Sequence, residues 1–284
     1  LRCRCPRADD PSRPSGTGLG IVSESERTVL FIDLVDFTVA TVTHGDHTAA
    51  DLAERLVELT TSSLGSTDQL VKGLGDAVMI VCHKPHNALA LAGRICDRAD
   101  HESAFPLLRM GLHHGPVVER HDDWFGTTVN IAARLAALAG PGDVLTTDTV
   151  VTAAAGAGMK VEQLGAQRLR GITEPVEVFS VTPCPAEPNR VIDPICRMAV
   201  ERTLAAATRT QGGNEYHFCS VTCVNTFDRT YGGQATHPLA APETGEPDEN
   251  EQHREGPDEQ PGEGSHPEKV RGSTPETSRW DRRR

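Results

Sequence analysis

Two acidic side chains stand in apolar surroundings, where a carboxylate is unfavourable unless something compensates its charge. Asp33 follows the apolar residues 29–32, and Asp76 follows Gly75 between two further apolar segments. A buried charge needs a counter-charge, hydrogen bonds or a metal ion. If the two segments form neighbouring strands, both carboxylates meet at one sheet edge and offer oxygen ligands to hard divalent ions such as Mg²⁺. For Asp33 alone, the alternative is a structural role as the cap of the turn that follows its strand.

A second polar pair has the chemistry to act on phosphate. Asn130 and Arg134 are four residues apart, so they share one face of a predicted helix. The planar guanidinium of an arginine matches the geometry of phosphate oxygens. The alternative is that both residues belong to the solvated face of an amphipathic helix.

The elements that position these residues are predicted from hydrophobic periodicity and turn signals. Thr48 and Asp51 fit a helix-capping box, and Gly75–Asp76 is a two-residue turn signal within a hairpin. The predicted strands are residues 26–34, 67–74, 77–82, 107–118, 143–147 and 176–181, and the predicted helices are residues 48–64, 88–99 and 127–139. The order βαββαβ is that of the ferredoxin-like motif, so the sequence predicts an α+β fold with extra strands around this core.

Four blocks in order along residues 26–182 resemble the catalytic domain of class III adenylyl and guanylyl cyclases. These blocks are FIDLVDFT (31–38), KGLGD (72–76), FGTTVNIAARL (125–135) and LRGITEPVEVF (169–179). The resemblance implies a ferredoxin-like core and a role in intracellular signal transduction. It also implies that the chain converts a nucleoside triphosphate into a cyclic nucleotide and pyrophosphate, with two Mg²⁺ or Mn²⁺ ions held by Asp33 and Asp76.

The resemblance also assigns roles to the residues that contact the nucleotide. Asn130 would orient the ribose, and Arg134 would stabilise the reacting phosphate. Backbone N–H groups would cradle the phosphates, and they belong to Leu34, Val35, Asp36, Phe37 and Thr38. Asp36 stands where the family usually has glycine, so its carboxylate would either assist the metal ions or repel the triphosphate and slow turnover.

Base selection by Lys72 favours ATP. The resemblance places Lys72 at a position where adenylyl cyclases of this family carry lysine and guanylyl cyclases tend to carry glutamate. A lysine can donate to adenine N1, whereas guanine N1 carries a hydrogen and needs an acceptor. The acidic partner is expected just before Phe125, at Asp123 or at the neighbouring Asp122. The sequence therefore predicts an adenylyl cyclase, with a guanylyl cyclase as the alternative. Family sites combine parts of two subunits, which implies a head-to-tail homodimer.

A small second module contains a group of cysteines. Residues 193–200 and 216–227 resemble the YHS domain, with Arg197 in place of the usual glycine. Cys196, Cys219 and Cys223 offer soft ligands for Cu⁺ or Zn²⁺. Cys219 and Cys223 are four apart and are predicted to share a helix face, and His217 is either a fourth ligand or points away. The alternative is a metal-free fold packed by aromatic side chains.

Regulation of the cyclase by a metal ion in this module is one hypothesis. The rival interpretations are a weak or inactive cyclase-like domain that binds nucleotide, and a copper or zinc sensor whose cyclase-like part only dimerises.

Composition sets the remaining expectations. The predicted domains are a disordered leader (1–24), the cyclase domain (25–182), a linker (183–189), the YHS-like module (190–233) and a disordered acidic tail (234–284). The net charge of −12 argues against nucleic acid as a partner. No apolar run approaches the roughly 18–20 residues of a membrane helix, and no signal peptide is recognised. The predicted location is cytoplasmic, where thiols or metal ligands are more common than disulfides.

Overall fold

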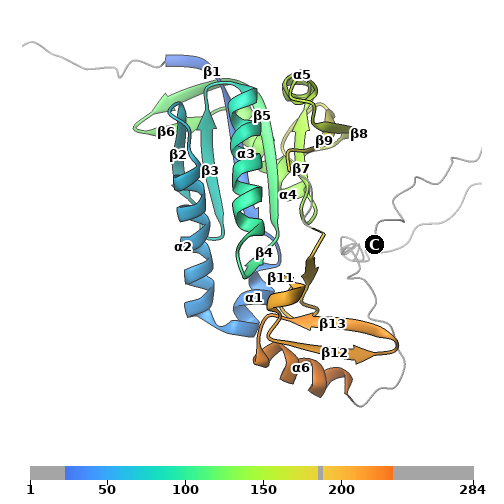
Figure 1. The fold of residues 1–284 in the computed structure, drawn as a ribbon. Coiled ribbons are helices and arrows are strands. Elements are labelled where there is room, and N and C mark those ends of the chain that lie inside the picture. Colours follow the sequence, from blue (N-terminus) through green and yellow to red (C-terminus); the bar gives the residue numbers. More distant parts are fainter. Residues whose placement is uncertain (1–22, 185–187, 233–284) are drawn as a thin grey trace, which may run out of the picture. The chain divides into compact units, whose positions relative to one another are not determined.

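The computed structural model describes residues 23–184 and 188–232 (Figure 1). The predicted acidic tail lies outside the described residues. So does the predicted leader, apart from its last two residues, which open the first strand. Among the described residues, no helix combines the length and the apolar character that crossing a membrane requires.

The main sheet has the predicted ferredoxin-like order at its centre, β2-β3-β1-β5, with all three neighbouring pairs antiparallel. It continues through β7, β9 and β8, and the short β6 pairs with β5. The strands of this sheet are β1 (Ser23–Leu34), β2 (Asp68–Gly73), β3 (Ala77–Cys82), β5 (Leu108–Arg120), β6 (Asp123–Phe125), β7 (Val144–Thr147), β8 (Lys160–Gln167) and β9 (Val176–Thr182).

Helices cover both faces of the central strands (Figure 1). These helices are α2 (Asp46–Ser63), α3 (Pro85–Asp100), α4 (Thr127–Leu138) and α5 (Asp148–Gly156). Val29 and Phe31 of β1 pack with Ala132 and Ala136 of α4 in one hydrophobic cluster. Because side chains alternate along a strand, Asp33 lies on the same face of the sheet as Phe31, the face that α4 covers.

One glycine allows α4 to lie directly on the sheet. Gly111 of β5 faces the backbone of α4, and a Cβ placed on it would lie 2.8 Å from the carbonyl carbon of Leu135. It would come still closer to the backbone N of Ala136 and the backbone O of Ala132. The position of α4 therefore depends on the absence of a side chain at residue 111.

The small module contributes a strand pairing to the cyclase-like part. Its elements are β10 (Arg190–Ile192), β11 (Met198–Glu201), the 3₁₀ turn η1 (Arg202–Leu204), β12 (Ala207–Gln211), β13 (Asn214–Phe218) and α6 (Val221–Tyr231). β11 pairs with β4 (Ala104–Pro106), where Phe105 is only 1% exposed. Arg190 adds hydrogen bonds to the carbonyl oxygens of Glu102 (3.0 Å) and Ala199 (3.1 Å).

The two-residue turn of the predicted hairpin is confirmed, because Gly73 lies opposite Val78 in the β2–β3 register and Leu74 N–H donates to the carbonyl of Ala77 (2.7 Å). Two other local predictions were wrong. The capping box at Thr48 does not exist, since α2 already begins at Asp46. Cys219 precedes Ser220, the N-cap of α6, so it does not share a helix face with Cys223.

Five elements of the cyclase-like part were not predicted: α1 (Phe37–His44), α5, β4, β6 and β8. The sequence of α1 is rich in threonine and valine, whose branched side chains favour strands over helices. The helix is eight residues long, and only its Ala40 is buried. A helix this short is stabilised by its surroundings rather than by its own propensity.

Candidate active site

Asp33 and Asp76 come from strands that neighbour each other, as the sequence predicted. Asp33 lies opposite Ala77 in the β1–β3 register, and the N–H of Leu34 donates to the carbonyl of Asp76 (3.0 Å). Burial raises the pKa of Asp33, and the nearby charge of Asp76 raises it further. The sheet edge therefore holds two acidic groups, and the charge of Asp76 disfavours the ionised form of Asp33.

Arg109 is a site residue that the sequence reasoning missed. It lies opposite Asp33 in the β1–β5 register, and its Nε donates to Asp33 Oδ2 (2.7 Å). Its Nη2 donates to the same oxygen, and this pairing opposes the rise in the pKa of Asp33. A cation inside the apolar strand 107–112 was the available signal, since it predicts an acidic partner on the next strand.

The predicted phosphate-binding turn has fewer free N–H groups than expected. The N–H of Val35 donates to the carbonyl of Leu107 (2.8 Å), and that of Leu34 is already bonded to Asp76. Both of these N–H groups therefore already have an acceptor within the domain. Asp36, Phe37 and Thr38 form the N-terminus of α1, where the first N–H groups of a helix have no intrahelical acceptor. Such N–H groups are suited to bind anions.

Asp36 adopts a left-handed backbone conformation with φ 55°. Its side chain makes no cap hydrogen bond with α1. Its carboxylate instead lies 3.6 Å from the guanidinium of Arg197, which is itself at φ 65°. Left-handed positions favour glycine, so both departures from glycine noted in the sequence occupy strained positions, and their side chains pair with each other.

Lys72 and Asp123 form an ion pair within one chain. Lys72 Nζ lies 2.7 Å from Asp123 Oδ1 and 2.6 Å from Oδ2. The Lys72 ammonium lowers the pKa of Asp123, so this carboxyl stays ionised. Asp122 is exposed in a tight turn at φ 61°. Of the two acids that the sequence left open, Asp123 is the one paired with Lys72.

Asn130 and Arg134 both lie on the exposed side of α4, and Arg134 Nε donates to the carbonyl of Arg170 (3.2 Å). The start of α4 lies against the far part of β5, where Thr128 Oγ1 donates to the carbonyl of Pro116 (2.8 Å). Arg109 is seven strand positions before Pro116, which corresponds to about 23 Å at roughly 3.3 Å per residue. The Asp33 edge and the start of α4 are therefore well separated within one chain.

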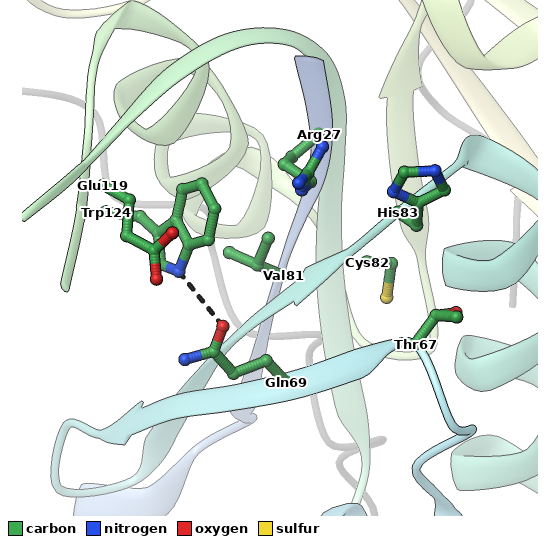
Figure 2. A pocket seen from close by; sticks show the side chains of 8 residues that line it. All are labelled: Arg27, Thr67, Gln69, Val81, Cys82, His83, Glu119 and Trp124. Atoms are coloured by element: carbon green, nitrogen blue, oxygen red, sulfur yellow. Dashed lines mark hydrogen bonds between the residues drawn. The ribbon is translucent and has the colours of Figure 1, made fainter. Parts of the chain in front are cut away.

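A surface hollow of about 360 Å³ lies elsewhere on the domain (Figure 2). It is lined by Arg27, Thr67, Gln69, Val81, Cys82, His83, Glu119 and Trp124. In it, Trp124 Nε1 donates to Gln69 Oε1 (3.3 Å). Cys82 and Asp33 belong to opposite ends of the β1–β3 register, and the hollow contains no predicted site residue.

The three cysteines of the small module come together as predicted, but with a different histidine. Their sulfur atoms and a ring nitrogen of His44 all lie within 4.8 Å of one another. His217 is buried elsewhere, with its Nε2 3.0 Å from Arg202 Nη1. His217 is therefore not the fourth member of this group.

Residues 21–182 match the family model of the adenylate and guanylate cyclase catalytic domain. The chain belongs to this family. The acidic edge, the helix α4 and the Lys72–Asp123 pair are thus parts of a nucleotide cyclase domain, and this domain has the mixed α+β core predicted from the sequence.

Curated relatives and solved structures agree with this assignment. The cyclase domain resembles a pH-sensitive adenylate cyclase of Mycobacterium tuberculosis, with 37% identity over 54% of this chain and 40% of the relative. An adenylate cyclase of Streptomyces coelicolor is 36% identical over 42% of this chain and 31% of that protein. The chain thus spans less than half the length of these relatives.

Two solved structures show the same fold. A Trypanosoma brucei adenylate cyclase gives a TM-score of 0.52 at 23% identity, covering 57% of this chain and 89% of that one. An adenylyl cyclase of P. aeruginosa gives a TM-score of 0.51 at 18% identity, covering 59% and 97%.

Proposed function

We propose that the chain is an adenylyl cyclase, which converts ATP into 3′,5′-cyclic AMP and pyrophosphate. The observation that carries the choice of ATP is the pairing of Lys72 with Asp123. An ammonium donates to adenine N1, and a carboxylate accepts from the adenine amino group. Guanine presents the opposite pattern at these positions. The names of the Mycobacterium and Streptomyces relatives point the same way.

The acidic edge fits two Mg²⁺ or Mn²⁺ ions. Asp33 and Asp76 supply hard oxygen ligands, and both hydrogen bonds from Arg109 go to Oδ2 of Asp33, so Oδ1 is the oxygen offered to a cation. When bound, such ions lower the pKa of the attacking hydroxyl and neutralise the leaving pyrophosphate. Because Asp76 and burial disfavour the ionised form of Asp33, a cation at this edge relieves an unfavourable arrangement.

The remaining steps fall to side chains and backbone of the protein. The N–H groups at the start of α1 bind phosphate oxygens. Arg134 stabilises the negative charge that develops on the α-phosphate, and Asn130 orients the ribose so that its 3′-oxygen is in line with the phosphorus. Lys72 and Asp123 hold the base. Placement and charge neutralisation are the main demands of transfer at phosphorus.

The site takes its two halves from two copies of the chain in a head-to-tail homodimer. The start of α4 and the Asp33 edge are separated within one chain. Twofold symmetry would bring the start of α4 of one copy beside the Asp33 edge of the other copy. Exposed apolar side chains near both halves fit a contact between copies, since Leu74 is 47% exposed and Phe125 is 50% exposed.

Mixing two inactive variants tests this arrangement. Asp33→Asn and Arg134→Ala are each expected to be inactive alone, because each removes one half of every site. After subunit exchange in equal amounts, half of the dimers contain one intact site, so about one quarter of the normal cyclic AMP formation is expected to return. Mixing Asp33→Asn with Asp76→Asn is the control and should restore nothing. Full exchange, shown by co-purification of differently tagged chains, without any recovery would refute the shared site.

Base selection is tested by Lys72→Glu, assayed with ATP and GTP side by side. The unchanged protein is expected to form cyclic AMP from ATP with Mg²⁺ or Mn²⁺ and little cyclic GMP. Loss of a charged hydrogen bond to the base should lower kcat/KM for ATP roughly 10–100-fold, and the ratio of ATP to GTP use should fall with it. Lys84→Glu makes the same charge change at an exposed position outside the site. It should leave kcat/KM for ATP and the ratio of ATP to GTP use unchanged. Preferred use of GTP by the unchanged protein would make it a guanylyl cyclase.

A further inference from the structure

A group of four side chains joins the small module to the cyclase domain. The sulfur atoms of Cys196 and Cys219 are 3.4 Å apart, and those of Cys219 and Cys223 are 3.7 Å apart. Nε2 of His44 lies 3.6 Å from Cys219 Sγ and 3.7 Å from Cys223 Sγ. Three of these residues belong to the small module, whereas His44 is the last residue of α1 in the cyclase domain.

These separations fit the ligands of one tetrahedral ion. Around Zn²⁺, sulfur at about 2.3 Å and nitrogen at about 2.0 Å place neighbouring ligand atoms about 3.5–3.8 Å apart. Three thiolates and one imidazole form a closed set typical of structural zinc sites. Three thiols and an imidazole at these separations gain little from contact with one another, so packing alone does not account for the group.

The protein scaffold fixes the cysteines before any ion arrives. Asp193 is fully buried, and its Oδ1 accepts hydrogen bonds from the N–H groups of Ile195 (2.8 Å) and Cys196 (3.4 Å). Its Oδ2 accepts from the N–H of Cys219 (2.8 Å). One carboxylate thus ties together the two loops that carry Cys196 and Cys219. Cys223 is held in the first turn of α6 by Ser220, whose Oγ accepts from its N–H (3.3 Å).

The fourth ligand belongs to a weakly held element of the cyclase domain. α1 has a single buried residue, Ala40, and its N-terminus is the proposed phosphate site. The small module contacts both ends of α1, through the Arg197–Asp36 pair at its start and through the cysteines at His44. An ion bound to His44 would therefore restrict the position of the N–H groups at the other end of the same eight-residue helix.

We propose that His44, Cys196, Cys219 and Cys223 bind one Zn²⁺ ion, and that this ion activates the cyclase by fixing α1 and the phosphate site at its start. Binding displaces the thiol protons and involves no change of oxidation state. The metal site stands on its own geometry. Only its effect on catalysis rests on the proposed function.

Metal binding is measured on the full chain after removal of metals under reducing conditions. Cys3 and Cys5 are replaced by serine in every sample, because this closely spaced pair could bind zinc independently. One Zn²⁺ per chain is expected, and Co²⁺ should give the intense visible bands of a tetrahedral site with thiolate ligands. His44→Ala removes a direct ligand, so it should weaken zinc binding strongly. The expected loss exceeds the roughly 10–100-fold that removal of a residue hydrogen-bonded to a ligand costs. His47→Ala, an exposed histidine three residues on, and Cys96→Ser should bind normally.

Binding of Cu⁺ but not Zn²⁺, or a stoichiometry unchanged by Cys219→Ser, would overturn the zinc site. So would a disulfide between two of the three cysteines that persists under these reducing conditions.

Coupling to catalysis is read in two ways. Zn²⁺ should slow amide hydrogen exchange in residues 37–44, and it should raise the rate of cyclic AMP formation about 10-fold, within the usual range of such coupling. Both effects should be lost in His44→Ala and kept in His47→Ala. Zinc binding with unchanged exchange and unchanged activity would disprove the coupling but not the site. If the protein makes no cyclic nucleotide with or without zinc, the proposed function fails while the binding and exchange results still decide the metal site.

Discussion

Asp33→Asn is expected to abolish cyclic nucleotide formation, lowering kcat/KM by roughly 10³-fold or more, as removal of a central electrostatic contribution does. The amide keeps the shape of the side chain and can still interact with Arg109, but it cannot supply the negative charge that holds two cations beside Asp76. Because the damage is to metal binding, excess Mn²⁺ is expected to recover part of the rate. That part should be small, since the missing negative charge is not replaced. The measurement is the initial rate of cyclic AMP formation across a range of ATP and Mn²⁺ concentrations.

Asp51→Asn makes the same chemical change at an exposed position on α2 and should leave kcat/KM unaltered. Thermal unfolding of both variants controls for damage to the fold. A variant at Asp33 that turns over ATP at the normal rate would exclude this carboxylate from the reaction and leave the family resemblance as evidence of fold only.

Among substitutions that add a single methyl group to the domain, Gly111→Ala is expected to give the largest loss of stability. The new Cβ would overlap backbone atoms of α4 at Ala132 and Ala136, and backbone cannot rotate aside as a side chain can. Overpacking of this kind lowers the free energy of unfolding by about 3 kcal/mol. For a chain of this size the midpoint of thermal unfolding should fall by about 6–12 °C. Since α4 carries Asn130 and Arg134, cyclic AMP formation should fall even below the new midpoint.

Gly73→Ala is the matched control. Gly73 also lies in a strand of the main sheet, but a Cβ there would meet only Val57 Cγ2, at an ordinary 3.7 Å. A change of less than about 1 kcal/mol in the free energy of unfolding is expected for it. Equal melting temperatures of Gly111→Ala and the unchanged protein would mean that α4 can move away from β5 without loss.

Local sequence signals were sufficient for the centre of the fold and the acidic edge. The apolar run before Asp33 and the turn before Asp76 each mark a strand, and antiparallel pairing of the two strands brings the acids together. Lys72 and Asp123 were matched through the family resemblance, and their ion pair confirms that they lie together. The catalytic roles of these residues, the domain boundaries and the cytoplasmic location stay predictions.

Long-range contacts limited the rest. Arg109 pairs with a residue 76 positions earlier, and His44 approaches a cysteine 175 positions later. No spacing rule connects residues so distant, so the sequence offered only the local candidate, His217, as a fourth metal ligand. α1 was missed for a related reason. Its β-branched sequence does not favour a helix, and its conformation depends on α2 and α6, which contact it in the folded chain.

The pairing of β4 with β11 has a practical consequence for anyone who expresses the cyclase domain by itself. A chain cut at residue 182 would lack β11, leaving β4 with open hydrogen-bonding groups and baring Phe105, which is otherwise covered. Exposed strand edges of this kind promote aggregation. Poor solubility of such a truncated protein would reflect an incomplete sheet rather than a defective catalytic centre.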